Sequence, residues 1–315
     1  MPDYSERGKN IMTKTVKLLI IIASAAVILG LILGAAGFFI FGIDREPLEE
    51  FNKSYDAAIT GIYIDVDIAD VRIYKTEGDK IEVAYYDNDN NYFTLEERDS
   101  ELHIKRKSPL YWFGSLNWFG SGIKYELEIG IPESFYGTLW IESDVGDIKV
   151  TELTLTDCKL SSSTGNIDCE SVICSESFSA SVSTGKISIT SVTAKTITAK
   201  SNTGNINGKS IICSERFNAS LNTGSISITD IEAKSITACS DTGGIKIKRM
   251  TVSESIYLET DTGDIYGSVT DGIGNYTIAS DTDVGDNNLP GNLTGGSKKL
   301  EVYTDTGDIE FDFNK

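Results

Sequence analysis

Histidine is almost absent from this sequence: His103 is the only one in 315 residues. Histidine is the commonest general base in enzymes and the commonest metal ligand in proteins, so both kinds of site lose their usual residue. His103 lies in a strand-like run and is most simply a solvated residue or one at a sheet edge. We therefore expect a protein that is not an enzyme and that carries no cofactor.

Basic residues are also scarce. The chain has 28 Lys+Arg against 47 Asp+Glu, which gives a formal net charge of −19. Proteins that bind nucleic acid neutralise phosphates with Lys and Arg, so this balance argues against nucleic acid as a partner. It favours a soluble surface that repels anions.

Charge is missing altogether from residues 18–43. As a helix this segment would measure roughly 39 Å, enough to cross a hydrocarbon core of about 30 Å. Four basic residues precede it: Arg7, Lys9, Lys14 and Lys17. Because basic residues stay on the cytoplasmic side, we predict a single-pass protein of the cell membrane. Its N-terminal tail over residues 1–17 would be cytoplasmic, residues 18–43 a transmembrane signal anchor, and residues 44–58 a linker to an extracytoplasmic domain. A cleaved signal peptide is the alternative, although its apolar stretch would be unusually long.

A short motif of the form Ser/Asn/Asp-Thr-Gly-x-Ile recurs along the second half of the chain. Its glycines recur with a period of about 20 residues up to Gly263, and the last copy, at Gly307, follows roughly two periods later. We interpret that last interval as two coils with a degenerate corner at Gly285. A period of this length is typical of a solenoid, in which each coil buries its apolar face against its neighbours. The predicted structural turns are at Gly146, Gly165, Gly185, Gly204, Gly224, Gly243, Gly263 and Gly307.

Apolar and polar residues alternate on both sides of each glycine, as at Ile187 and Ile189 after Gly185. Alternation by two is the period of a strand with one buried face. Three such stretches in each repeat predict three short strands and three corners per coil. The predicted fold class is therefore all-β, with a parallel β-solenoid of ~19–22-residue coils over residues 136–315. An N-terminal β cap over residues 59–135 and one transmembrane α-helix would precede it.

When the repeats are aligned on their corner glycines, equivalent residues form columns that point inward or outward, and this alignment also places the cysteines. Cys158, Cys169, Cys174 and Cys213 fall in inward columns, as small apolar core residues or, alternatively, as partners in disulfides between stacked coils. Cys239 falls in an outward column and should be the exposed thiol. We expect no catalytic role for it, because no histidine or basic group accompanies it in sequence.

An aromatic segment interrupts the predicted cap region. Five aromatic residues fall within twelve positions together with glycines, which is typical of an exposed loop. Such a loop could rest on a membrane interface or hold a partner. Alternatively, it folds over the end of the solenoid as a plug. The candidate contact residues are Tyr111, Trp112, Phe113, Trp118 and Phe119.

Carboxylates pair across several glycine corners, and the candidates for a Ca²⁺ site are Asp261 with Asp264 and Asp305 with Asp308. Oxygen ligands in stacked turns suit Ca²⁺. The middle coils have Ser, Asn and Lys at these positions, however, and Asp and Asn favour turns for backbone reasons alone. We therefore expect structural turns and no metal site, with calcium binding as the alternative.

The chain resembles the DUF4097 family of adhesin-like β-strand repeat proteins from bacterial envelopes. The resemblance covers roughly residues 55–315 and rests on the segment Ile64–Ile73, on Ile129–Pro132 and on the repeated Thr-Gly corners. It implies a membrane-anchored or exported accessory protein, and it supplies no catalytic residues.

From these observations we predict a non-enzymatic, membrane-anchored β-solenoid that acts as an adhesin-like binding or structural module of the cell envelope. Its sheet face, lined with Ser and Thr, would offer hydroxyl groups to an envelope glycan or to a membrane protein. The alternative is an envelope-stress sensor or regulatory accessory protein that acts through a membrane partner. The acidic charge argues against simple attraction to anionic wall polymers.

Overall fold

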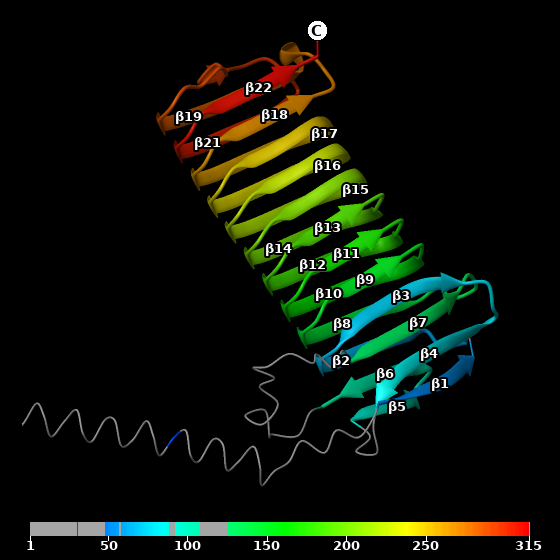
Figure 1. Ribbon diagram of the computed structural model, residues 1–315. Coiled ribbons are helices and arrows are strands. Elements are labelled where there is room, and N and C mark those ends of the chain that lie inside the picture. The colour runs from blue at the N-terminus through cyan, green and yellow to red at the C-terminus, as the bar shows by residue number, and fades with distance from the viewer. Residues whose placement is uncertain (1–29, 31–47, 57, 88–91, 108–124, 315) are drawn as a thin grey trace, which may run out of the picture. The chain divides into compact units, whose positions relative to one another are not determined.

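The computed structural model describes residue 30 and residues 48–56, 58–87, 92–107 and 125–314. From residue 48 onward these residues form strands that stack coil upon coil (Figure 1). The region before the repeats contains β1 (Glu49–Asp56), β2 (Gly61–Ile68), β3 (Asp70–Thr76), β4 (Lys80–Asp87), β5 (Phe93–Arg98), β6 (Glu101–Arg106) and β7 (Glu126–Pro132).

The repeats supply the middle of the stack. Their strands are β8 (Thr138–Val145), β9 (Ile148–Thr151), β10 (Thr154–Thr164), β11 (Ile167–Glu170), β12 (Ile173–Thr184), β13 (Ile187–Thr190), β14 (Thr193–Thr203), β15 (Ile206–Thr223), β16 (Ile226–Thr242) and β17 (Ile245–Thr262). The C-terminal part contains β18 (Ile265–Val269), the 3-10 helix η1 (Ile273–Asn275), β19 (Tyr276–Val284), β20 (Asn292–Leu293), β21 (Lys298–Thr306) and β22 (Ile309–Phe313).

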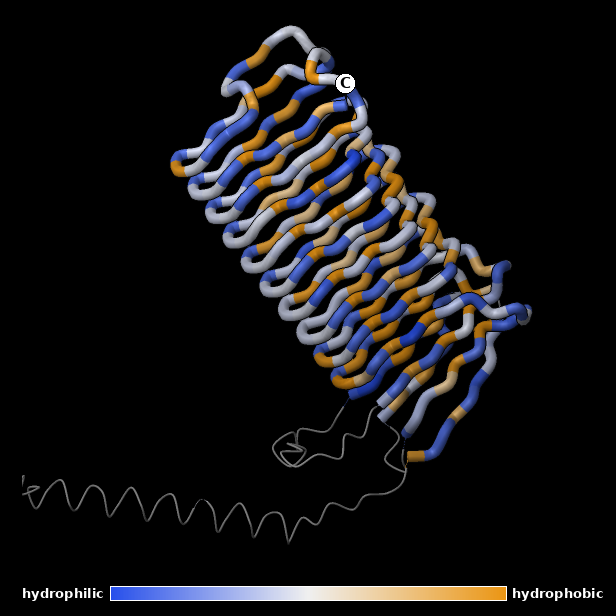
Figure 2. Tube along the Cα trace, turned by 45° about the horizontal axis from the view of Figure 1, so that its top comes forward, coloured by the Kyte–Doolittle hydropathy of each residue, from blue (hydrophilic) through white to orange (hydrophobic). Residues whose placement is uncertain are grey.

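Equivalent residues of successive coils pair in parallel register. Phe178 on β12 faces Ile197 on β14, which in turn faces Phe217 on β15. All three are at most 1% exposed. Figure 2 shows hydrophobic positions recurring at the same place from coil to coil. The core is therefore a set of apolar columns that run along the stack, as the alternation in the sequence predicted.

Each Thr-Gly corner packs directly on the corner of the preceding coil. The backbone N–H of Gly165 donates to the carbonyl oxygen of Thr184 in the next coil, at 3.0 Å. Gly165 has a φ of 149°, a backbone conformation that residues with a Cβ rarely adopt. An added Cβ at this position would also overlap the carbonyl oxygen of Gly146. Conformation and contact thus both require glycine at this corner.

Buried hydroxyl groups satisfy several of these corner carbonyls. The side chain of Thr260 donates to the carbonyl oxygen of Gly243 at 2.9 Å, and that of Thr304 donates to Gly263 at 3.0 Å. Both threonines are at most 4% exposed. Because an unpaired buried carbonyl costs about 1–3 kcal/mol, this polar column inside the stack stabilises the corner.

A second corner of each coil has a left-handed backbone without glycine. The residues there have φ between 53° and 61°, and they are Glu152, Ser171, Ser191, Ser210, Asp230 and Arg249. A non-glycine residue in this region costs of the order of 1 kcal/mol, so packing of the flanking strands must hold it there.

At the N-terminal end the coils do not stack in chain order. β2 lies between β6 and β8, and β3 lies between β7 and β9. The chain therefore forms the coil of β2 and β3, moves outward to build β4–β7, and returns to continue with β8. Antiparallel pairs of β1 with β4 and of β5 with β6 flank this end.

The C-terminal end uses the same device. β21 pairs with β17 on one side and with β19 on the other, and β22 stacks on β18 (Figure 1). The two coils predicted after Gly263 thus exist, but the later coil lies nearer the middle of the stack and the earlier coil lies at its end. The amide side chain of Asn288 then pairs with the backbone of Phe311, accepting from its N–H at 2.9 Å and donating to its carbonyl at 3.2 Å. This contact covers the edge of β22, which would otherwise be open to pairing with another chain.

The predicted fold class is wrong in one part, the transmembrane α-helix. Crossing a bilayer takes about 20 apolar residues in a helix. Among the residues that the structure describes, no helix is long and apolar enough to do so. Residues 18–43, where we predicted that helix, lie outside the described residues except for Gly30. The corrected fold class is an all-β solenoid.

The corner packing predicts a large difference between two glycines. Gly204 has a φ of 144°, and an added Cβ would overlap the carbonyl oxygen of Gly185. Gly204→Ala should therefore lower the free energy of unfolding by at least about 2 kcal/mol. Gly78 lies in an exposed turn where the nearest atom to an added Cβ is 3.9 Å away. Gly78→Ala should stay within about 0.5 kcal/mol of the wild type. Urea unfolding of both variants tests this, and equal losses would contradict it.

Candidate functional site

A long polar sheet face is formed by the parts of β10, β12, β14, β15 and β16 that precede their Thr-Gly corners in sequence. We call it the hydroxyl face. Its outward side chains are exposed or half-buried and mostly uncharged: Ser161, Ser163, Ser179, Ser181, Ser183, Thr196, Thr198, Asn202, Asn218, Ser220, Asn222, Ser235 and Thr237. Charged residues interrupt this face at only a few of its positions, such as Lys159, Lys200 and Arg216. Each hydroxyl group can both donate and accept a hydrogen bond.

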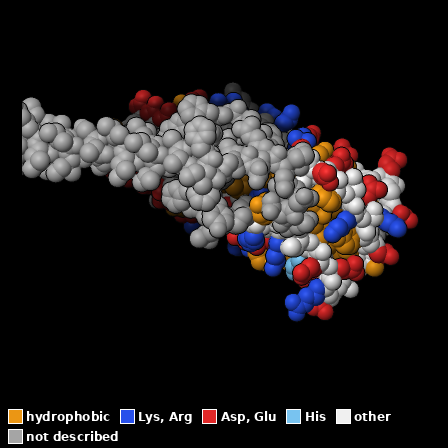
Figure 3. Space-filling view, turned by 60° about the horizontal axis from the view of Figure 1, so that its bottom comes forward, with side chains coloured by type: hydrophobic (Ala, Val, Ile, Leu, Met, Phe, Trp, Pro, Cys, Tyr) orange, Lys and Arg blue, Asp and Glu red, His pale blue; other side chains and the backbone are white. Residues whose placement is uncertain are grey.

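A row of rings crosses neighbouring strands near the N-terminal end of the same face. His103 on β6 stacks on Tyr63 on β2 with ring centroids 5.0 Å apart, and Tyr63 meets Trp140 on β8 edge-on at 5.8 Å. The ammonium group of Lys159 lies 4.4 Å from the centre of the Trp140 ring. These rings contact one another across neighbouring strands, and the contacts stabilise the strand pairing. Figure 3, which looks toward this end, shows hydrophobic side chains among acidic and basic ones.

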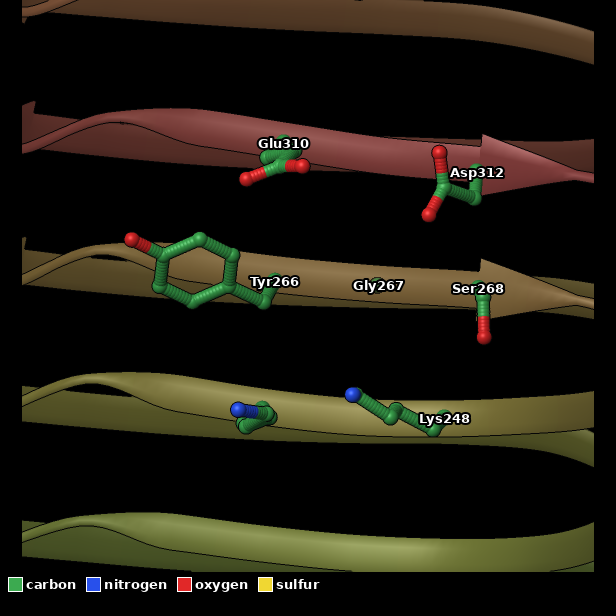
Figure 4. A pocket seen from close by; sticks show the side chains of 7 residues that line it. Lys248, Tyr266, Gly267, Ser268, Glu310 and Asp312 are labelled. Carbon is green, nitrogen blue, oxygen red and sulfur yellow. The ribbon is translucent and has the colours of Figure 1, made fainter.

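A groove of about 450 Å³ lies on a different sheet face, near the C-terminal end (Figure 4). Three adjacent strands form it. Lys246 and Lys248 on β17 line one side, Glu310 and Asp312 on β22 line the other, and Tyr266, Gly267 and Ser268 on β18 form the floor. We call the two sides the lysine wall and the acid wall.

Strand register aligns the groove in rows. Lys246 pairs with Tyr266, which pairs with Glu310, while Ser268 pairs with Asp312. The hydroxyl oxygen of Ser268 accepts a hydrogen bond from the backbone N–H of Arg249 at 2.9 Å, so its own proton can point to a ligand.

Gly267 occupies an inward position, where the ring of Phe311 takes the space that a Cβ would need. The backbone of the groove floor at Gly267 is therefore held in place by packing against the core residue Phe311. The acid wall exists only because β22 is inserted next to β18.

The four charged groups of the groove are not neutralised locally. Among the described residues none of them lies within 4.0 Å of an opposite charge, in contrast to Lys195, which is 2.5 Å from Glu176. The pKa of the Tyr266 hydroxyl is raised, chiefly by the nearby charge of Asp264 and then by burial. Tyr266 therefore stays protonated and neutral at physiological pH. The groove offers a cationic side, a neutral aromatic floor and an anionic side.

The residues singled out from the sequence are distributed as follows. The eight corner glycines all lie at the stacked corner with φ between 128° and 153°. The aromatic contact candidates between Tyr111 and Phe119 lie outside the described residues. His103 is half-buried in the ring row, with its Nε2 3.2 Å from Glu101. The groove was not predicted, because its walls are far apart in sequence and nothing in the repeat indicates that β22 lies beside β18.

The carboxylates proposed as calcium ligands take part in backbone hydrogen bonds between coils. Asp264 accepts from the backbone N–H of Asp308 at 2.9 Å, and Asp308 accepts from that of Asp286 at 2.8 Å. The amide side chain of Asn205 makes the same contact with Ser225, at 2.9 Å. Asp261 and Asp305 are exposed at the same corner. Within the described part of the chain, no three Asp, Glu, Cys or His side chains gather in a way that could hold a metal ion.

All five thiols are free in the structure. Cys158, Cys169, Cys174 and Cys213 are buried, as the inward columns predicted, whereas Cys239 is only half-exposed. Burial raises the pKa of the Cys169 thiol, and a hydrogen bond with Cys174 together with burial raises that of Cys158. The Cys158 and Cys169 thiols therefore stay protonated at neutral pH. The four buried cysteines pack as small apolar core residues.

Fold and surfaces of the described residues together define an all-β solenoid with capped ends, a mostly uncharged outer face and a dipolar groove. The chain belongs to the Toastrack DUF4097 family, whose model matches residues 59–311. No curated protein matches it.

Several solved structures are similar to it. A "putative adhesin" from Bacteroides fragilis is 16% identical and covers 84% of this chain and 97% of its own, with a TM-score of 0.44. A "putative adhesin" from Parabacteroides distasonis is 13% identical over 85% of this chain and 98% of its own, with a TM-score of 0.45. A "putative lipid binding protein" from the same species is 13% identical over 83% of this chain and 97% of its own, with a TM-score of 0.43.

The contact between Asp264 and Asp308 separates a hydrogen-bonding role from a calcium role. Asp264→Asn keeps the acceptor oxygen, so its free energy of unfolding should stay within about 0.5 kcal/mol of the wild type, whereas Asp264→Ala should lose about 1 kcal/mol. Both results should be the same in EDTA and in excess CaCl₂, as measured by urea unfolding. A calcium-dependent stabilisation of the wild type that disappears in Asp264→Asn would instead establish a calcium site.

Proposed function

We propose that this protein is a non-enzymatic binding module of the bacterial cell envelope, and that its hydroxyl face holds an extended, uncharged polymer such as an envelope glycan. The observation that carries the proposal is the run of Ser, Thr and Asn side chains on the outward positions of β10, β12, β14, β15 and β16.

The geometry of a parallel stack suits a repeating ligand. Each of the five strands carries at least one Ser or Thr on this face, and neighbouring strands lie about 4.8 Å apart over several coils. One sugar residue has a comparable length, so successive sugars can meet successive strands. Each hydrogen bond contributes little by itself, but tethered contacts along one polymer add through their high effective concentration.

The charge of the chain restricts the kind of polymer. With 28 Lys+Arg against 47 Asp+Glu, the chain repels anionic wall polymers and anionic headgroups. A neutral polymer that is bound through hydroxyl groups avoids this repulsion. Its affinity should also respond little to salt, because salt screens charges and leaves hydrogen bonds largely unchanged.

Two pairs of substitutions in the same coils test the hydroxyl face. Ser181→Glu with Ser220→Glu places two charges in the middle of the face, whereas Thr190→Glu with Thr229→Glu places them on the neighbouring sheet face formed by β13 and β16. The full-length chain should sediment with purified neutral envelope glycan at low and at high NaCl alike. The first pair should weaken that binding at least tenfold, and the second should leave it unchanged.

Three outcomes would contradict the proposal. The chain could fail to bind any envelope polymer, both pairs could weaken binding equally, or binding could vanish at high salt. Crosslinking of the intact protein in its own cells, with a membrane protein as the only product, would favour the regulatory accessory role instead.

A further inference from the structure

We propose that the groove between the lysine wall and the acid wall binds a dipolar peptide segment, one that carries an amine and a carboxylate about three residues apart. This inference deepens the binding role proposed above and rests on it. It assigns the groove a ligand class that differs from the uncharged polymer on the hydroxyl face, and the two sites lie on different faces of the solenoid.

The like charges inside each wall indicate a ligand. Lys246 and Lys248 are two residues apart on one face of β17, and Glu310 and Asp312 are two residues apart on one face of β22. Two residues along a strand span about 6.6 Å, so the charges of each wall repel one another. The walls themselves stand two strands apart, about 9.6 Å, and do not neutralise each other. A bound segment with one charge of each sign relieves both repulsions.

The distance between the walls fixes the length of the segment. An extended peptide spans about 3.3–3.6 Å per residue, so three residues cover about 10 Å. Such a segment would lie across the strands, its carboxylate toward Lys246 and Lys248 and its amine toward Glu310 and Asp312.

The floor of the groove suits a peptide backbone. The ring of Tyr266 offers an apolar surface in the middle of the groove, with the ammonium group of Lys246 5.7 Å from its centre. The hydroxyl proton of Ser268 is available to a peptide carbonyl, because its oxygen already accepts from Arg249. A neutral contact in the middle and opposite charges at the two sides together select a dipolar chain over a uniformly charged one.

Three blocked peptides probe the groove on the full-length chain by calorimetric titration. The dipolar probe is acetyl-Lys-Ala-Ala-Glu-amide, and the controls carry two lysines or two glutamates at the same positions. We expect the dipolar peptide to bind at least about tenfold tighter than either control. Equal affinity for all three peptides, or no binding of the dipolar one, overturns the proposal.

Charge reversal of the walls gives the sharper test. Lys246→Glu with Lys248→Glu, or Glu310→Lys with Asp312→Lys, should each reduce the affinity for the dipolar peptide about tenfold. The four changes together exchange the two walls, so the peptide can bind in the opposite direction and its affinity should return to within about threefold of the wild type. Lys149→Glu with Lys209→Glu, on the same sheet face but outside the groove, should have no effect.

The two binding sites can fail separately. Loss of peptide binding with glycan binding intact overturns the groove alone, and the reverse result overturns the hydroxyl face alone. If the fourfold variant fails to fold, the two wall variants and the lysine control still show whether the peptide binds in the groove. Equal peptide binding by all of these variants would show that the groove is not the site.

Discussion

The stacking of glycine on carbonyl at the Thr-Gly corner is the contact on which the rest of this structure depends. Each corner glycine leaves room for the carbonyl oxygen of the coil before it, and its N–H donates to the coil after it. This contact allows one arrangement of neighbouring coils, so inward and outward columns stay in line over the whole stack. The apolar columns can then form a continuous core, and the Ser, Thr and Asn columns can form a continuous outer face. A shift by one residue at a single corner would point the apolar side chains outward and the polar side chains into the core.

The ends of the stack solve a problem that the repeat itself creates. A solenoid of parallel strands exposes backbone groups at both ends, which invites pairing with other chains. At both ends two coils exchange places relative to chain order: β6 and β7 lie outside β2 and β3, whereas β21 lies inside β19. The strands at the ends then meet antiparallel neighbours or the amide of Asn288. The insertion of β22 beside β18 also places the acid wall opposite the lysine wall. The same topological step thus closes an edge and builds a groove.

The sequence was sufficient for the repeated part of the fold and insufficient for its ends. The regular glycine period and the alternation around each glycine predicted the coils, the core columns and the burial of four cysteines. The left-handed second corner has no residue signature, because Ser, Asp, Glu and Arg all occur there. The repeat period also does not reveal the order of the coils, because the sequence spacing of β19 and β21 is the same whichever of them pairs with β17. The groove was missed for that reason. The transmembrane helix was predicted from the length of one charge-free segment and from the basic residues before it.

Coil order at the C-terminal end can be measured directly, and both the groove and the closed edge depend on it. Thr262, Val284 and Thr306 each precede a corner glycine, and Thr306 pairs with both of the others. With Cys239 replaced by serine, cysteine pairs at these positions report which corners are adjacent, because a disulfide needs Cα atoms about 4.4–6.8 Å apart. Mild oxidation should crosslink the pair at 262 and 306 and the pair at 284 and 306, and it should leave the pair at 262 and 284 reduced. Crosslinking at 262 and 284 with none at 262 and 306 would show that the coils stack in chain order, and it would contradict the account given for this end of the molecule.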